Sequence, residues 1–173
     1  MRLRTKQIKP PEFSGQEGRR RVLVEESDPA MRGAITRLLD DAGFEAIGCG
    51  GPEDHSGRRC PLDSGYGCDA TAGTDVIFFS FRLANPENQK ILKDLKRLHP
   101  KTPIVVEIPK PQAVGHHGLL VGTHIVYAPV TRRSLTEAIL DALAAPDPII
   151  ATLRKKIDWT SSGTIESKPQ RSQ

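Results

Sequence analysis

Long apolar runs are absent from this chain of 173 residues. No run approaches the roughly 20 residues that a transmembrane helix needs. The N-terminal segment is basic and lacks the apolar core of a secretion signal. We therefore expect a cytoplasmic protein without a membrane contact.

Cysteines and large aromatic residues are also scarce. The chain has three cysteines, one tryptophan and two tyrosines. So few cysteines in a cytoplasmic protein are typical of thiols or metal ligands rather than of a disulfide framework. The hydrophobic fraction of 37% is low for a chain that is all core, and there are 15 glycines and 14 prolines. These numbers favour one ordered domain with polar ends.

Positive charge is concentrated at the two ends of the chain. The formal net charge is +4 and the isoelectric point is about 9.1, and the central region is close to neutral. We predict a disordered basic tail over 1–20, a domain over 21–145, and a polar, largely disordered tail over 146–173 in which 149–159 could form a short helix. Basic tails either contact nucleic acid weakly or only keep the chain in solution.

Short apolar segments alternate with amphipathic ones along the domain. The predicted strands are RVLVEE (21–26), EAIGC (45–49), DVIFFSF (75–81), PIVVEI (103–108) and HIVYAP (124–129). Helices with N-caps at Asp28 and Asn85 follow the first and third strands, a helix with its N-cap at Thr131 follows the fifth, and 112–122 is a weak helix or a loop. The alternation predicts a three-layer α/β/α fold with a five-stranded parallel sheet in the flavodoxin-like order 2-1-3-4-5. A glycine- and cysteine-rich loop over 50–73 largely replaces the second helix.

Several short motifs occur in a consistent order over 21–145. They are the acids that end the first strand, DP at the start of the first helix, LLDDAGFEA, DVIFFS, HPKTPIVV, and AP after the fifth strand. Together they resemble the receiver domain of bacterial response regulators, which has the chemotaxis-regulator-like fold. The resemblance covers about 70% of the chain and implies a regulatory protein.

The resemblance also implies where phosphotransfer chemistry would be found. A working receiver needs two carboxylates that hold Mg²⁺, an acceptor aspartate, a hydroxyl on the fourth strand and a lysine on the fifth. The paired acids fall on Glu26 and Ser27, and the acceptor falls on Ser80. The hydroxyl position holds Ile108 and the lysine position holds Ala128. The phosphorylation pocket is therefore degenerate, and we expect a pseudo-receiver that does not accept a phosphoryl group.

The loop between the second and third strands contains a second candidate site. Its members are Cys49, His55, Cys60 and Cys68. Three thiols and an imidazole are a conceivable zinc set, although zinc ligands usually include a pair two to four residues apart. Reversible thiol chemistry between Cys60 and Cys68 is a second alternative, since neighbouring arginines would lower a thiol pKa. In a third alternative, the loop has no chemical role and Cys49 is a small core residue. No other cofactor is expected.

Acidic residues are expected to gather at the crevice formed by the C-terminal ends of the strands. They are Glu25, Glu26, Asp28 and Glu107. They would form either a weak cation site or a solvated acidic rim. The adjacent His116 and His117 are interpreted as surface residues.

The resemblance finally implies a partner-binding face on the fourth helix, fifth strand and fifth helix. Its members here are Leu119, Leu120, Val121, Tyr127, Arg132 and Arg133. We expect a stand-alone, non-phosphorylated regulatory module that binds a protein partner of unknown identity, and the sequence leaves a homodimer open. One alternative is a metal- or redox-responsive sensor that uses the loop Cys49–Cys68. Another is a nucleic-acid- or ribosome-associated factor bound through the basic tails. An enzyme is not expected, because no nucleophile and base stand at a recognisable spacing.

Overall fold

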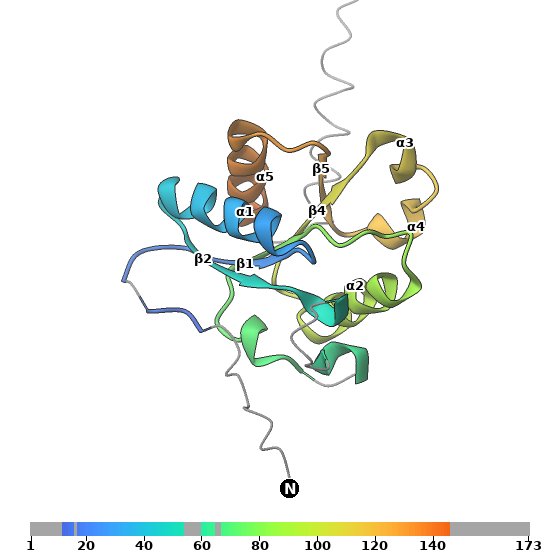
Figure 1. The fold of residues 1–173 in the computed structure, drawn as a ribbon, viewed down its shortest axis with the longest axis horizontal. Helices are drawn as coiled ribbons and strands as arrows, with labels where there is room; N and C mark the ends of the chain where they lie inside the picture. Colours follow the sequence, from blue (N-terminus) through green and yellow to red (C-terminus); the bar gives the residue numbers. More distant parts are fainter. Residues whose placement is uncertain (1–11, 16, 54–59, 65–66, 146–173) are drawn as a thin grey trace, which may run out of the picture.

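The structure is a computed structural model that describes residues 12–15, 17–53, 60–64 and 67–145 (Figure 1). Its strands, α-helices and 3₁₀ helices (η) are, in chain order, β1 (Arg21–Glu25), α1 (Pro29–Asp41), β2 (Glu45–Cys49), η1 (Gly51–Glu53), η2 (Pro61–Ser64), η3 (Asp69–Thr71), β3 (Val76–Phe79), α2 (Pro86–Leu98), β4 (Ile104–Ile108), α3 (Lys110–Ala113), α4 (His117–Leu120), β5 (His124–Tyr127) and α5 (Arg132–Ala144).

The five strands form one parallel sheet in the order β2-β1-β3-β4-β5, as predicted. In the register of the sheet, Val24 lies between Gly48 of β2 and Phe78 of β3. The described residues between β2 and β3 form only the short helices η1, η2 and η3, so the expected loss of a regular second helix is confirmed.

Helices cover both faces of the sheet, which gives three layers (Figure 1). Successive strand residues point to opposite faces. Val22 and Val24 therefore pack with α1 and α5, whereas Leu23 packs with η2, η3 and α2. Burial on both faces explains why β3 is an unbroken apolar run.

Side chains at the predicted positions cap the three long helices. Asp28 Oδ1 accepts a hydrogen bond from the Met31 N–H at 2.8 Å, and Asn85 Oδ1 accepts one from the Glu87 N–H at 2.9 Å. Thr131 and Ser134 form a reciprocal capping box at the start of α5. These caps satisfy N–H groups that have no partner within the helix, and so fix where each helix begins.

Part of the segment predicted as an N-terminal tail lies against the domain. The Arg19 guanidinium donates hydrogen bonds to the carbonyl oxygens of Asp40, Gly43 and Phe44. Ser14 Oγ donates to Glu45 Oε1 at 2.8 Å. Residues 1–11 and the predicted tail 146–173, with its short helix, lie outside the described residues.

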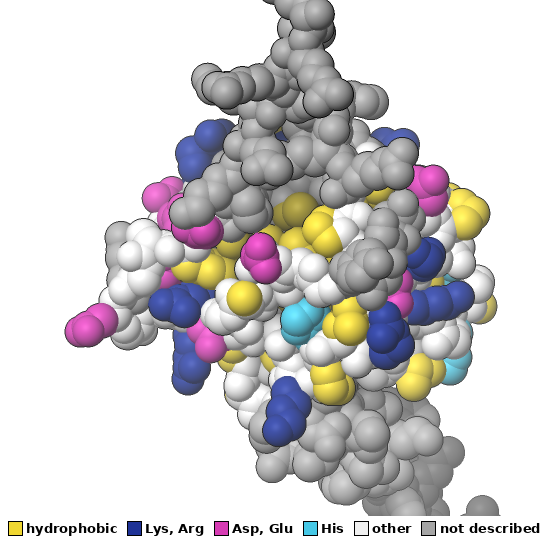
Figure 2. Space-filling model, turned by 90° about the horizontal axis from the view of Figure 1, so that it is seen from below, with side chains coloured by type: hydrophobic (Ala, Val, Ile, Leu, Met, Phe, Trp, Pro, Cys, Tyr) yellow, Lys and Arg dark blue, Asp and Glu magenta, His cyan; other side chains and the backbone are white. Residues whose placement is uncertain are grey.

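Charges of both signs occur on the face of the molecule shown in Figure 2, with apolar side chains between them. The described residues visible on this face therefore form no uniform basic patch of the kind that binds nucleic acid. Among the described helices, none has both the length and the apolar character needed to cross a membrane.

Candidate functional site

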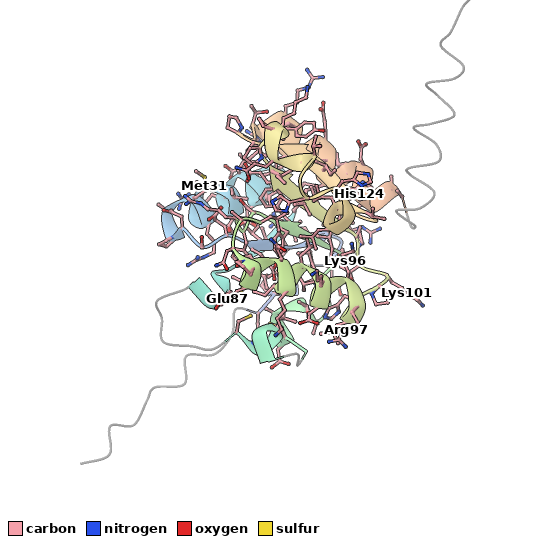
Figure 3. All side chains as sticks on the ribbon, turned by 90° about the vertical axis from the view of Figure 1, so that its right-hand side faces the viewer. Met31, Glu87, Lys96, Arg97, Lys101 and His124 are labelled. Atoms are coloured by element: carbon pink, nitrogen blue, oxygen red, sulfur yellow. The ribbon has the colours of Figure 1, made fainter. Side chains whose placement is uncertain are left out.

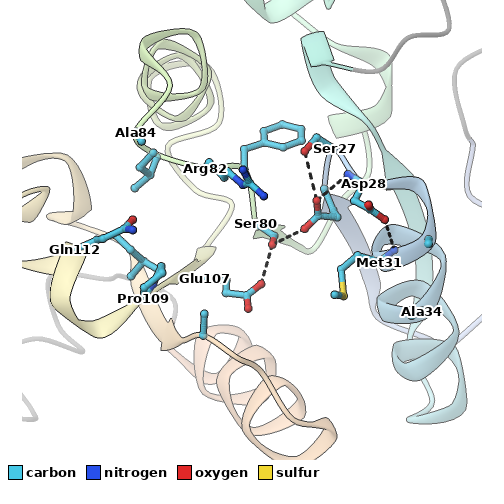
Figure 4. A pocket seen from close by; sticks show the side chains of 16 residues that line it. Ser27, Asp28, Met31, Ala34, Ser80, Arg82, Ala84, Glu107, Pro109 and Gln112 are labelled. Carbon is cyan, nitrogen blue, oxygen red and sulfur yellow. Dashed lines mark hydrogen bonds between the residues drawn. The ribbon is translucent and has the colours of Figure 1, made fainter.

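A pocket of about 700 Å³ opens at the C-terminal ends of β1, β3, β4 and β5 (Figure 4). The strand order reverses between β1 and β3, and sheets of this class place their ligand sites at such a point. The residues predicted to form the degenerate phosphorylation pocket all line it: Glu26, Ser27, Ser80, Ile108 and Ala128.

Ser80 lies at the centre of the pocket floor, directly after β3. Its Oγ is 2.8 Å from Glu26 Oε2 and 2.7 Å from Glu107 Oε2 (Figure 4). The two carboxylates come from the ends of β1 and from β4, so the contact joins three neighbouring strands. The expected meeting of Glu26 and Glu107 at the crevice is found.

The turn between β1 and α1 holds the Glu26 side chain in place. Glu26 Oε1 accepts a hydrogen bond from the Asp28 N–H at 2.8 Å. Arg32 Nη1 donates to the carbonyl oxygens of Glu26 and Ser27, at 2.6 Å and 3.2 Å. Asp28 itself caps α1, and its side chain is therefore used in a structural contact at the pocket edge.

Apolar groups, the Gln112 amide and one guanidinium complete the pocket. Ala30, Met31, Ala34, Phe81, Leu83, Ile108, Pro109 and Ala128 line its walls. Arg82 lies at the mouth above Ser80 (Figure 4), and no described residue forms an ion pair or side-chain hydrogen bond with its guanidinium. Ile108 is almost fully buried in the core, and thus presents only hydrocarbon at the position expected for a hydroxyl.

The position after β3 holds an alcohol, and an alcohol needs an activating base or metal to act as a nucleophile. A carboxylate is a weak base toward a hydroxyl, and no histidine lines the pocket.

Glu25 does not join the acidic group at the crevice, contrary to expectation. Strand alternation turns it to the opposite face of the sheet, where it influences the thiols of Cys49 and Cys68. It is only 2% exposed, and its Oε2 has no hydrogen-bond partner in the described part of the chain. Burial raises its pKa from 4.5 to about 8, because the low-dielectric interior disfavours the charged form.

The three cysteines are free thiols, and Cys49 and Cys68 lie near Glu25. Burial, together with the nearby Glu25 carboxylate, raises the pKa of Cys49 to about 12, and burial likewise raises the pKa of Cys68. Both shifts disfavour the thiolate, which is the reactive and metal-binding form.

The described residues include no group of three or more His, Cys, Asp or Glu side chains placed to bind a metal ion. His55 and the two arginines just before Cys60, Arg58 and Arg59, lie outside the described residues, and the zinc and redox interpretations stay predictions.

The predicted partner face is divided between surface and core. Leu120, the last residue of α4, is only 4% exposed, and its side chain packs into the core. Leu119 is partly buried, and Lys96 Nζ of α2 donates to its carbonyl oxygen at 3.0 Å. Figure 3 shows Lys96 on the same side of the molecule as His124, where β5 begins. Leu120 is therefore not available to a partner in this conformation.

The exposed part of this face lies on β5 and at its two ends. Val121 is 58%, Ile125 41% and Tyr127 48% exposed, and Lys110 Nζ lies 5.9 Å from the centre of the Tyr127 ring. The predicted arginines lie at the start of α5, where each has a partner. Arg132 donates to the Asp41 carbonyl oxygen, and Arg133 pairs with Glu137.

Comparison with known proteins supports the fold. No family model and no curated protein matches the sequence. The chain is similar to the chemotaxis protein CheY4 of Vibrio cholerae, with 16% identity over 72% of this chain and 98% of that chain and a TM-score of 0.55. It is also similar to a response regulator receiver domain protein from Clostridium thermocellum, with 17% identity over 80% of this chain and 98% of that chain and a TM-score of 0.57.

The fold is therefore that of CheY-like receiver domains. A protein described as an adenylate cyclase, from Rhodopirellula baltica, matches at 14% identity over 80% of this chain and 96% of that chain, with a TM-score of 0.53. At such low identities the likeness defines the fold alone, and the function depends on the residues of the site.

Sequence reasoning placed the residues of the pocket but missed how two of them are used. Glu107 was expected at the crevice as one of several acids, but its direct contact with Ser80 was not predicted. Its position one residue before the end of β4 puts it on the opposite face from Ile108, which the period-two rule would have shown. Arg82 follows β3 by three residues in an irregular segment, and no sequence pattern indicated that it lines the pocket.

Proposed function

We propose that this protein is a regulatory module that binds a protein partner and is not switched by phosphorylation. The observation that carries the proposal is the hydroxyl of Ser80, held between Glu26 and Glu107 where a receiver needs a reactive carboxylate. Ala128 supplies no cation that could neutralise a phosphoryl group. The fold is kept while the charges needed for the reaction are missing, which supports a role in binding rather than catalysis.

The surface around β5 is the part of the module that we assign to the partner. β5 is an edge strand, and an exposed edge with apolar side chains favours association with another chain. Ile125 and Tyr127 supply those side chains, and Val121 extends the apolar surface beyond the end of α4. Tyrosine in particular is enriched at sites that dominate binding energy.

Replacing Ile125 and Tyr127 together by glutamate is expected to abolish partner binding. Two charges on an apolar contact would have to be desolvated, which weakens a complex by at least tenfold for each buried charge, about 1.4 kcal/mol or more. The measurement is affinity capture from the source cell with full-length protein as bait, followed by quantitative mass spectrometry.

Arg37→Glu on the exposed side of α1 provides the matched control. It should retain every specific partner, and both variants should melt at the wild-type temperature. A partner captured equally well by the β5 double variant would contradict the assignment of this face. A partner captured only after treatment with acetyl phosphate would contradict the proposal that phosphorylation is not the switch.

A further inference from the structure

The contacts of Ser80 leave the pocket floor short of one hydrogen-bond donor. A serine hydroxyl carries a single proton and can donate to only one acceptor at a time. Here two carboxylate oxygens lie within 2.8 Å of Ser80 Oγ. The Glu107 side chain has no other hydrogen-bond partner among the described residues, whereas the Glu26 side chain also accepts from the Asp28 N–H. Glu107 is therefore the carboxylate that has most to gain from a donor supplied by a ligand.

The walls of the pocket favour an organic ligand over a bare ion. Met31, Phe81, Leu83 and Ile108 place hydrocarbon around the carboxylates, and the volume of about 700 Å³ is in the range of small-molecule sites. A hard divalent cation takes six or more oxygen ligands. The described residues offer no group of three or more acidic, histidine or cysteine side chains placed to bind a metal.

Arg82 adds a charge of the opposite sign at the mouth of the pocket. Its guanidinium makes no ion pair or side-chain hydrogen bond with the described residues, although it stands above the two carboxylates (Figure 4). An arginine fork matches a carboxylate in two parallel hydrogen bonds. A ligand with an ammonium at one end and a carboxylate at the other would thus find a partner for each charge.

We propose that this crevice binds a small zwitterion with an apolar body, such as a branched amino acid. The ammonium donates to Glu107 and Glu26, the carboxylate accepts from Arg82, and the apolar body lies against Met31 and Phe81. Binding at the C-terminal ends of the strands would let a small molecule regulate the module. The ligand site does not depend on the partner surface at β5, so either of these two assignments can be wrong while the other is right.

The test is a titration of the full-length, ¹⁵N-labelled protein followed by amide chemical shifts. Leucine is the zwitterionic probe. Isopentylamine keeps its ammonium and lacks its carboxylate, and 4-methylpentanoate keeps the carboxylate and lacks the ammonium. MgCl₂ is the fourth titrant and tests a bare cation.

We expect saturable shifts at Ser80, Arg82 and Glu107 with leucine. Isopentylamine should bind about tenfold more weakly, because it loses the charge-assisted hydrogen bonds to Arg82. 4-Methylpentanoate should not bind, because it has no ammonium to offset the like charges of Glu26 and Glu107. Glu107→Gln should weaken leucine binding about tenfold. The Arg82→Ala variant should bind leucine only as tightly as the wild type binds isopentylamine. Glu137→Gln, on the exposed surface of α5, is the matched control and should bind as the wild type does.

The opposite outcomes overturn the proposal. They are an absence of saturable shifts with leucine and isopentylamine up to their solubility limits, equal binding of 4-methylpentanoate and leucine, or wild-type affinity in Glu107→Gln. Shifts at these amides with MgCl₂ alone would assign the crevice to a metal ion instead.

Discussion

Replacing Glu25 by glutamine is expected to stabilise the protein at pH 8 and to remove the loss of stability that this carboxyl causes between pH 5 and pH 8. The carboxyl of Glu25 has a pKa of about 8 in the folded protein and an ordinary value of 4.5. Between these values the folded chain keeps a proton that the unfolded chain releases. Raising the pH through this window therefore favours unfolding, and the full stability of the protonated form is present only below about pH 4.5.

The expected size of this effect is large for one side chain. A single group that keeps its proton only in the folded state changes the free energy of unfolding by about 1.4 kcal/mol per pH unit, so the wild type should lose up to about 4 kcal/mol between pH 5 and pH 8. Glutamine resembles the protonated carboxyl in shape and cannot ionise. Urea unfolding at intervals of half a pH unit measures the slope for each protein.

The exposed Glu137 provides the control, since its replacement by glutamine should leave the slope of the wild type unchanged. Parallel stability curves for wild type and Glu25→Gln over pH 5–8 would show that Glu25 is not held in its neutral form.

Gly51→Ala is expected to be the most damaging of the small substitutions in the loop region. Gly51 has a φ of +63°, which favours glycine, and an added Cβ would lie 2.3 Å from Cζ and 2.7 Å from Cε2 of Phe81. Phe81 is only 2% exposed and lines the pocket, so its ring has little room to move. Backbone strain and overpacking together should cost about 2–4 kcal/mol.

Two other glycines allow the effect of backbone strain to be distinguished from that of overpacking against Phe81. Gly43 has a φ of +94° but nothing within 4 Å of an added Cβ, and Gly67 has neither a positive φ nor a close neighbour. Urea unfolding should rank the alanine variants with Gly51 worst, Gly43 intermediate and Gly67 near wild type. Equal losses at Gly51 and Gly43 would mean that contact with Phe81 contributes nothing.

The regular elements could be predicted from sequence because each depends on short-range rules. The cap at Asn85 with Pro86 fixed the start of α2, and the unbroken apolar run of β3 indicated a strand buried on both faces. The alternation of strands and helices then allowed few sheet orders, and the predicted one was found.

The side-chain geometry of the crevice could be predicted only in part. Glu26 and Ser80 follow strand ends, and their place in the fold puts them together. Adjacent residues on a strand face opposite sides of the sheet, so Glu25 and Glu26 cannot both point into the crevice. Which of them does so depends on where β1 ends. The approach of Glu107 to Ser80 depends on the register between β3 and β4, which the sequence does not state.

The loop between β2 and β3 was the least predictable part. Its cysteines were considered for their reactivity, whereas the structure shows Cys49 and Cys68 in surroundings that raise the pKa of their thiols. That effect comes from burial and from Glu25, a residue on a different strand. A hydrogen bond between Thr71 Oγ1 and His99 Nε2 also ties η3 to the end of α2, across a long stretch of sequence.

The intact mass of the protein after incubation with acetyl phosphate and Mg²⁺ at neutral pH tests the central claim most directly. A receiver that can be phosphorylated is treated in the same way as a positive control. Because Ser80 is an alcohol held between two carboxylates, we predict that the mass of this protein stays unchanged while the control gains one phosphoryl group. A phosphoryl group located on Ser80, Glu26 or Glu107 would contradict the proposal that this receiver fold works without phosphorylation.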